Sequence, residues 1–144
     1  MIELPGKKIR LRILLPTETK VDEPVDMVIM RCTTGDMGIL PGHEPRSAVL
    51  RIGILRILDE GSERRIAVYG GLAVVKGDVL SIIANEAEWP EEIDLTRAQA
   101  DREHAEQRLH EKTDDMEIQN DQVLLRRALV QIEVSAYAYA QEDE

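Results

Sequence analysis

Aromatic residues and cysteine are scarce in this sequence of 144 residues. Phenylalanine is absent, and tryptophan and cysteine each occur once. A hydrophobic core must therefore consist mainly of Ile, Val, Leu and Met, and no disulfide can form within the chain, which favours a reducing compartment. The sequence also lacks any apolar run near the ~20 residues that a membrane-spanning helix needs. Because Lys and Arg interrupt the apolar residues at positions 1–16, we expect a strand there rather than a signal peptide.

Positively charged residues are also fewer than negatively charged ones. The sequence has 18 Lys and Arg and 28 Asp and Glu, so the formal net charge is −10. Binding to a nucleic-acid backbone requires a basic surface, so this composition argues against a nucleic-acid partner. The negative charge is unevenly distributed, because residues 1–90 carry a net charge of −1 and residues 91–144 carry −9. This difference indicates two parts with different physical character.

The hydrophobic pattern changes near Trp89, where the charge also changes. Before this residue, short runs rich in β-branched residues alternate apolar and polar positions, as in KIRLRIL, and turn-forming glycines such as Gly61 and Gly77 separate them. A period of two is typical of strands that bury one face. Many short strands joined by such turns predict a β-sandwich or a barrel, which we place at residues 1–88.

After Pro90 the pattern becomes helical. Residues 91–112 contain no Gly or Pro, and Asp94 is well placed to cap a first helix. A break at residues 113–115 precedes a second helical run, so residues 91–144 are predicted to form an antiparallel hairpin. The apolar residues that the first helix offers to the second are few: Leu95, Ala98, Ala100, Ala105 and Leu109. Because two such helices bury little area, we expect the hairpin to be marginally stable alone and mobile.

The segment GDMGILPGHEP, residues 35–45, is rich in glycine and proline. Its glycines match neither G-x-G-x-x-G nor G-x-x-x-x-G-K-[ST], which argues against a phosphate-binding loop. We interpret it as a rigid, irregular corner, with Ile39 and Leu40 in the core and Asp36 and His43 facing outward. A structural hydrogen-bonding role is favoured over a catalytic one for this histidine.

Catalytic and metal-binding patterns are missing from the rest of the sequence. No serine lies in G-x-S-x-G, and His104 and His110 are spaced so that they would point away from each other on a helix. The second histidine of a zinc-protease helix is also missing. We therefore predict no catalytic residues, no metal site and no enzymatic activity for the chain alone. Cys32, in the apolar run MVIMRCT, is expected to be a buried strand residue.

Three segments resemble, in order, the ε subunits of bacterial F-type ATP synthases. TTGDMGILPGHEP resembles the family's signature, RIAVYGGLAVVKGDVLSIIANEAE its later strands, and EEIDLTRAQADREHAEQRL the first helix of its C-terminal hairpin. The match extends over nearly the whole chain. It implies an α+β fold, with an N-terminal antiparallel β-sandwich of about ten strands followed by a C-terminal antiparallel two-helix hairpin.

The resemblance also implies a place in a rotary motor. Members of this family are non-catalytic subunits of the central stalk that join the γ subunit to the c ring, on the cytoplasmic face of the bacterial cell membrane. They are peripheral and reach the membrane only through their partners. Asp36 falls where the family's acidic loop residue meets the c ring, and His43 falls in the loop that packs near γ. The hairpin regulates ATP hydrolysis, because it can extend into the catalytic head of α and β subunits.

In some bacterial members the folded hairpin binds one ATP, which implies ATP as a regulatory ligand although no cofactor is required. The residues that match this pattern are Glu88, Ile93, Asp94, Arg97, Ala98 and Arg127. In place of a second arginine the sequence has Gln131, which keeps a hydrogen-bond donor but lacks the charge and the paired donors suited to phosphate. The ordinary alternative is that Asp94 only caps a helix and that Arg97 pairs with Asp101 on the surface.

Three functions are therefore to be compared. The first is the rotor subunit, the second is a stand-alone ATP-sensing protein that uses the hairpin, and the third is a small-ligand enzyme on the sandwich. The missing catalytic patterns disfavour the third. Strongly inhibitory members of the family tend to carry a basic second helix, so the acidic hairpin of this chain predicts weak inhibition of ATP hydrolysis.

Overall fold

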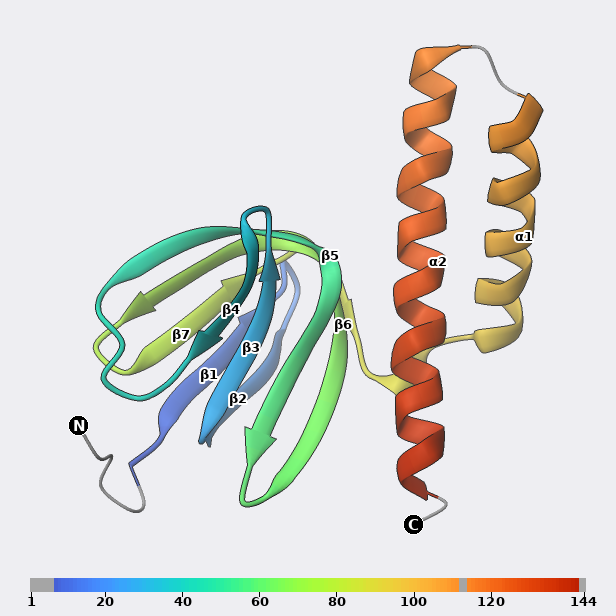
Figure 1. Ribbon diagram of the computed structural model, residues 1–144. Helices are drawn as coiled ribbons and strands as arrows, with labels where there is room; N and C mark the ends of the chain where they lie inside the picture. The colour runs from blue at the N-terminus through green and yellow to red at the C-terminus, as the bar shows by residue number, and fades with distance from the viewer. Residues whose placement is uncertain (1–6, 112–113, 143–144) are drawn as a thin grey trace. The chain divides into compact units, whose positions relative to one another are not determined.

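The computed structural model of this chain describes residues 7–111 and 114–142 (Figure 1). The chain divides into two compact units, Met1–Ala87 and Glu88–Glu144, and each is described by itself. The first unit is built from strands and the second from helices. Within the described residues, no helix is both long enough and apolar enough to cross a membrane.

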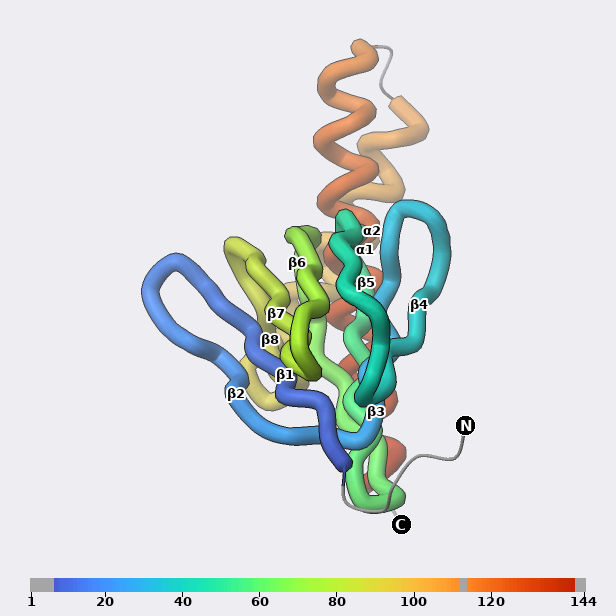
Figure 2. The backbone as a smooth tube through the Cα atoms, turned by 90° about the vertical axis from the view of Figure 1, so that its left-hand side faces the viewer, coloured from blue at the N-terminus to red at the C-terminus, as the bar shows by residue number. Residues whose placement is uncertain are grey.

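The described residues contain one sheet of eight strands, and its last strand ends at Glu88, the first residue of the second unit. They are β1 (Ile9–Leu14), β2 (Thr19–Val25), β3 (Met27–Cys32), β4 (Gly35–Ile39), β5 (Arg46–Asp59), β6 (Ser62–Lys76), β7 (Val79–Ile83) and β8 (Ala87–Glu88). The order across the sheet is β2-β1-β7-β6-β5-β3-β4, and β8 pairs with β6 (Figure 2). Along this order every neighbouring pair is antiparallel except β1 and β7, which are parallel. The predicted β-rich unit is confirmed, with one parallel pair added to it.

Two long strands explain why the described sheet has eight strands where the resemblance implied about ten. β5 and β6 pair over most of their length, but the pairing skips a position between the partners Leu50–Gly71 and Ile52–Tyr69. Gly70 and Gly71 lie at this skip with φ of 81° and 138°. A Cβ added at Gly71 would lie 2.4 Å from a carbonyl oxygen of β7, so only glycine fits there. The glycines let one continuous strand bend where two shorter strands would otherwise be counted.

The core of the first unit is aliphatic, as the composition predicted. On β1 the side chains of Ile9, Leu11 and Ile13 are fully buried, in the alternation that the sequence shows. Other large, fully buried side chains come from β3 to β7 and include Met30, Ile39, Leu55, Ile57, Ile66, Leu80 and Ile82. Cys32, at the end of β3, is buried too, which confirms the expectation for this residue.

The segment at residues 35–45 is more regular than predicted. Its first half forms β4, an edge strand paired with β3, rather than an irregular corner. Ile39 is fully buried, but Leu40 is 45% exposed, so the prediction that both lie in the core is wrong for Leu40. Successive side chains of a strand point to opposite faces, and a buried Ile39 at the end of β4 therefore turns the next side chain outward.

The second unit contains a short 3₁₀ turn, η1 (Pro90–Glu92), and two helices, α1 (Leu95–Glu111) and α2 (Asp115–Glu142) (Figure 1). The helices run antiparallel, as predicted (Figure 1). Asp94 caps α1, because its Oδ1 accepts the backbone N–H of Arg97 at 3.1 Å. Asp114 caps α2 in the same way, through the N–H of Met116 at 2.9 Å. Thr113, part of the predicted break, lies outside the described residues.

The seam between α1 and α2 combines small, fully buried side chains with larger, half-buried ones. The buried residues of the two helices are Ala98, Ala105, Asp121, Ala128, Val130 and Val134. On the α1 side the predicted contacts Ala98 and Ala105 are fully buried, whereas the predicted contact Ala100 is exposed. On the α2 side Asp121 and Ala128 share one helix face with the half-buried Leu125 and Ile132. The buried carboxylate of Asp121 is a feature that no sequence pattern indicated. The seam is therefore thin on α1, as predicted, and thicker on α2.

Candidate functional site

The base of the hairpin brings together Glu88, Arg127 and Gln131. Arg127 and Gln131 are four residues apart on α2 and so lie on the same side of the helix. Nε2 of Gln131 donates a hydrogen bond to Oε1 of Glu88 at 3.2 Å. Nη2 of Arg127 lies 3.9 Å from the same oxygen, and the Glu88 and Arg127 side chains are 22% and 32% exposed. The glutamine that replaces an expected arginine thus holds the carboxylate of Glu88.

The other residues matched to the ATP pattern have varied surroundings. The carboxylate of Asp94 is engaged as the helix cap, and its backbone carbonyl accepts the N–H of Ala98 at 3.0 Å. The side chain of Ala98 is buried in the seam. Arg97 is exposed, and no ion pair joins it to Asp101 in the part of the chain that is described. Its guanidinium is therefore open to solvent, whereas the carboxylate of Asp94 already has a structural task.

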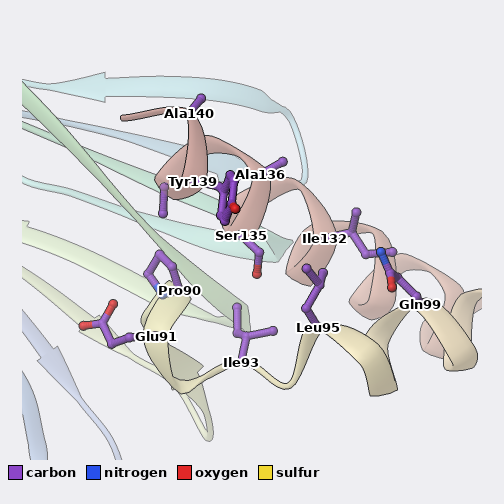
Figure 3. Close-up of a pocket in the computed structure, with 11 residues that line it drawn as sticks. Pro90, Glu91, Ile93, Leu95, Gln99, Ile132, Ser135, Ala136, Tyr139 and Ala140 are labelled. Atoms are coloured by element: carbon purple, nitrogen blue, oxygen red, sulfur yellow. The ribbon is translucent and has the colours of Figure 1, made fainter. Parts of the chain in front are cut away.

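An apolar groove of about 690 Å³ lies beside these residues, between η1, the start of α1 and the C-terminal half of α2 (Figure 3). Ile93 lines it together with Pro90 and Leu95, and the remaining wall comes mainly from α2. The α2 residues of the wall include Ile132, Ser135, Ala136, Tyr139 and Ala140. Their spacing of i, i+3, i+4, i+7 and i+8 is that of one helix face. This spacing is the signal in the sequence that could have predicted the groove.

One buried polar atom of the groove, in the part of the chain that is described, has no hydrogen-bond partner. The hydroxyl oxygen of Ser135 is buried and has no hydrogen-bond partner among the described residues. Figure 3 shows this hydroxyl directed from α2 into the groove. The other polar side chains of the lining are those of Glu91, Gln99 and Tyr139. Such a surface offers apolar contact and a few hydrogen bonds but no nucleophile paired with a base.

In the first unit, the predicted contact residues lie at opposite ends of the segment 35–45. Asp36 is on the edge strand β4, where its side chain is 60% exposed and its Oδ1 lies 3.3 Å from Nε of Arg31 on β3. His43 follows a turn after β4, and its Nδ1 lies 2.8 Å from the carbonyl oxygen of Glu44. Within the described residues, no group of three or more His, Cys, Asp or Glu side chains is arranged to hold a metal ion.

Comparison with known proteins matches each unit to a family model. Residues 8–90 match the β-sandwich domain of the ATP synthase delta/epsilon chain, and residues 91–136 match the long α-helix domain of the same chain. The chain belongs to the ATP synthase delta/epsilon family. Both parts of the resemblance noted in the sequence, sandwich and hairpin, are therefore confirmed.

Individual relatives agree with this assignment to the ATP synthase family. The ATP synthase epsilon chain of Bacillus velezensis is 38% identical over 129 residues, which is 90% of this chain and 98% of that protein. The ATP synthase epsilon chain of Bacillus subtilis is 40% identical over 112 residues, 78% of this chain and 85% of that one. A chain in the Euglena gracilis mitochondrial ATP synthase (OSCP/F1/c-ring) matches with a TM-score of 0.78 and 28% identity, over 95% of this chain and 84% of that chain.

Proposed function

We propose that this chain is the non-catalytic ε subunit of a bacterial F-type ATP synthase, and that it joins the γ subunit to the c ring in the central stalk. The observation that carries this proposal is that both units match the models of one family, in order, over residues 8–136. The epsilon chains of Bacillus species support it, as does the chain of similar fold in the Euglena F1/c-ring assembly. On this proposal the chain is peripheral, on the cytoplasmic face of the cell membrane, and is held there by its partners.

The β-sandwich would be the coupling element. Asp36 is exposed on an edge strand, where a partner loop can reach it, and we assign it to the c ring. His43 lies in a turn fixed by backbone hydrogen bonds, and we assign it to γ. Both residues would act as contacts and not as catalysts.

The hairpin would regulate ATP hydrolysis, and we expect its inhibition to be weak. The buried residues on the α1 side of its seam are alanines, so the two helices can separate at a modest cost in buried area. Residues 91–144 carry a net charge of −9. An acidic hairpin that enters a catalytic head with acidic loops meets like charge, which weakens the contact.

ATP is the regulatory ligand that we propose for the base of the hairpin. Arg97 and Arg127 would meet its phosphates, since a guanidinium presents paired donors to phosphate oxygens. Glu88 would then exchange its contacts with Arg127 and Gln131 for contacts with the ligand. This exchange has a cost, because the carboxylate already accepts a hydrogen bond. We therefore expect weak binding, selective for ATP over ADP.

Affinity purification from detergent-solubilised bacterial membranes tests the rotor assignment. Recovery of the tagged chain with γ, the c ring and the catalytic α and β subunits is the expected result. Recovery as a lone chain would support the stand-alone sensor instead. Truncation after residue 90 should leave co-purification intact and raise ATPase activity only slightly. A large rise would contradict weak inhibition.

Calorimetric titration of the full chain with ATP, and with ADP for comparison, tests the ligand. Arg127→Ala should abolish the heat of binding. Arg126→Ala is the matched control, since this neighbouring arginine is exposed and points about 100° away around the helix. If the unaltered chain gives no heat with ATP, the ligand proposal fails, whereas the rotor assignment is decided by the purification.

A further inference from the structure

Asp78 connects three segments that are far apart in the sequence. It follows Gly77 in the turn between β6 and β7, and both residues have positive φ, 61° for Asp78 and 57° for Gly77. Its backbone carbonyl accepts the N–H of Arg10 at 2.9 Å. Its Oδ1 accepts the N–H of Gly42 at 2.6 Å, and its Oδ2 lies 3.8 Å from Nζ of Lys7. The turn thus holds both the start of β1 and the segment after β4.

The segment held by Asp78 is a tight turn over residues 40–43. The N–H of His43 donates to the carbonyl oxygen of Leu40 at 3.2 Å, and Gly42 between them has a φ of 83°. Proline at the second position and a positive-φ glycine at the third are the signature of a type II turn. The bond within the turn leaves the N–H of Gly42 free to donate, and Oδ1 of Asp78 accepts it.

The geometry of this turn also determines which atom of His43 is available. Nδ1 lies 2.8 Å from the carbonyl oxygen of Glu44. A carbonyl oxygen can only accept, so Nδ1 must carry the proton of this bond. In the neutral imidazole the other nitrogen, Nε2, is then an acceptor with no proton of its own. The turn therefore offers a hydrogen-bond acceptor to a donor group on a partner.

We propose that Asp78 is a positioning residue of the subunit-contact surface, and that its carboxylate fixes the turn so that Nε2 of His43 is set for the γ subunit before binding. This rests on the proposed function, which assigns His43 to γ. A turn that is already ordered avoids the conformational entropy cost of ordering at the interface. The bond from the N–H of Gly42 is charge-assisted and short, so it is the contact whose loss would release the turn.

Asp78→Gly is the variant that tests this proposal. Glycine adopts the positive φ of this position without strain, so the variant removes the carboxylate and keeps the backbone of the turn. Asp78→Asn keeps an acceptor oxygen for Gly42 and is the conservative variant. Lys76→Ala is the matched control, because it changes a charge next to the same turn, at an exposed side chain that no described hydrogen bond or ion pair involves.

The first readout is hydrogen exchange at the amide of Gly42, measured by NMR on the full chain. The second is the affinity of the chain for purified γ subunit. In Asp78→Gly we expect faster exchange at Gly42, unchanged exchange in β6 and β7, and about tenfold weaker binding to γ. Asp78→Asn should restore both readouts, and Lys76→Ala should change neither. His43→Ala should weaken binding while leaving exchange at Gly42 unchanged.

Two results would overturn the proposal. If exchange at Gly42 is unchanged in Asp78→Gly, the carboxylate does not hold the turn. If exchange rises but γ binds as tightly as before, the turn does not need to be held for contact. A failure of the unaltered chain to bind γ is a different result, since it contradicts the proposed function while exchange at Gly42 still decides whether Asp78 fixes the turn.

Discussion

For the ion pair between Arg108 and Asp121, removal of the arginine and removal of the aspartate are expected to change the free energy of opening of the hairpin differently. Asp121 is 2% exposed, and it is the one charged residue among the buried residues that the structure describes. Nε of Arg108 lies 3.5 Å from its Oδ2, and that oxygen has no hydrogen-bond partner within the described chain. A carboxylate in an otherwise small and apolar seam is costly to bury, and Arg108 offsets part of that cost.

The size of the expected change in the free energy of opening follows from the solvent exposure of Arg108 and Asp121. Removal of one partner from a fully buried pair costs about 3–5 kcal/mol, whereas an exposed pair is worth about 0–1 kcal/mol. The Arg108 side chain is 41% exposed and that of Asp121 is 3% exposed, so this pair lies between the two cases. We expect Arg108→Ala to lower the free energy of opening of the hairpin by about 2 kcal/mol. Asp121→Ala removes the buried charge and should leave that free energy unchanged or raise it by about 1 kcal/mol.

Hydrogen exchange at the amides of Ala105 and Ala128, in the middle of the seam, measures this opening in the full chain. Arg102→Ala is the control, because Arg102 lies on the same helix and pairs with Glu106 at 3.1 Å, but both side chains are about half exposed. It should change the free energy by no more than about 0.5 kcal/mol. If Asp121→Ala destabilises the hairpin as much as Arg108→Ala does, the buried carboxylate stabilises the folded pair and the reasoning fails.

Three further outcomes are expected. Hydrogen bonds from Arg56 lower the pKa of Glu63 from 4.5 to about 2. The stabilising contribution of Glu63 is therefore complete above pH 4.5 and is lost as the pH falls towards 2. Urea titrations should show that the free energy of unfolding falls less steeply with decreasing pH for Glu63→Gln than for the unaltered chain. Burial raises the pKa of Cys32, so its thiol should react with a disulfide reagent only after unfolding in urea, and a reaction in the folded protein would contradict its burial. Ala105→Leu should overpack the seam and destabilise the hairpin by about 1–3 kcal/mol, while Ala100→Leu, on the exposed face of the same helix, should have little effect on helix melting.

Local signals in the sequence predicted most of the fold. The alternation of Ile9, Leu11 and Ile13 indicates a half-buried strand, and the structure buries these three side chains. Asp94 is followed by a helix without glycine or proline, and it is the cap. In both places the information lies within one turn or one strand, where side-chain period and capping chemistry decide the conformation.

The features that the sequence did not predict depend on residues far apart in the chain. The edge strand β4 forms because β3 supplies hydrogen-bond partners to a segment whose glycine and proline content suggests an irregular loop. The parallel pairing of β1 with β7 joins strands that are separated by most of the first unit. Asp121 and Arg108 face each other only because the helices pack in one register. No local pattern carries such information.

In the candidate site, too, the sequence did not predict a contact between residues far apart in the chain. A residue-by-residue match grouped Glu88 with Arg127, and the structure does bring them together. The match could not show that Gln131 donates to Glu88, since that bond depends on the approach of a segment more than forty residues earlier. ATP binding at the base of the hairpin stays a prediction, which the calorimetric titration tests.

The positions of the polar contacts suggest how the hairpin could exchange between two states. At its base Glu88 meets Gln131, and towards the loop between the helices Arg108 meets Asp121, with apolar side chains of the seam in between. When the helices part, water replaces the contact between Arg108 and Asp121, so this contact contributes little net free energy to the closed state. The difference between the states then comes mainly from the seam, where a few fully buried alanines and half-buried larger side chains supply on the order of a few kcal/mol. A gap of that size can be reversed by a ligand or by a partner subunit, which is the property that a regulatory hairpin needs.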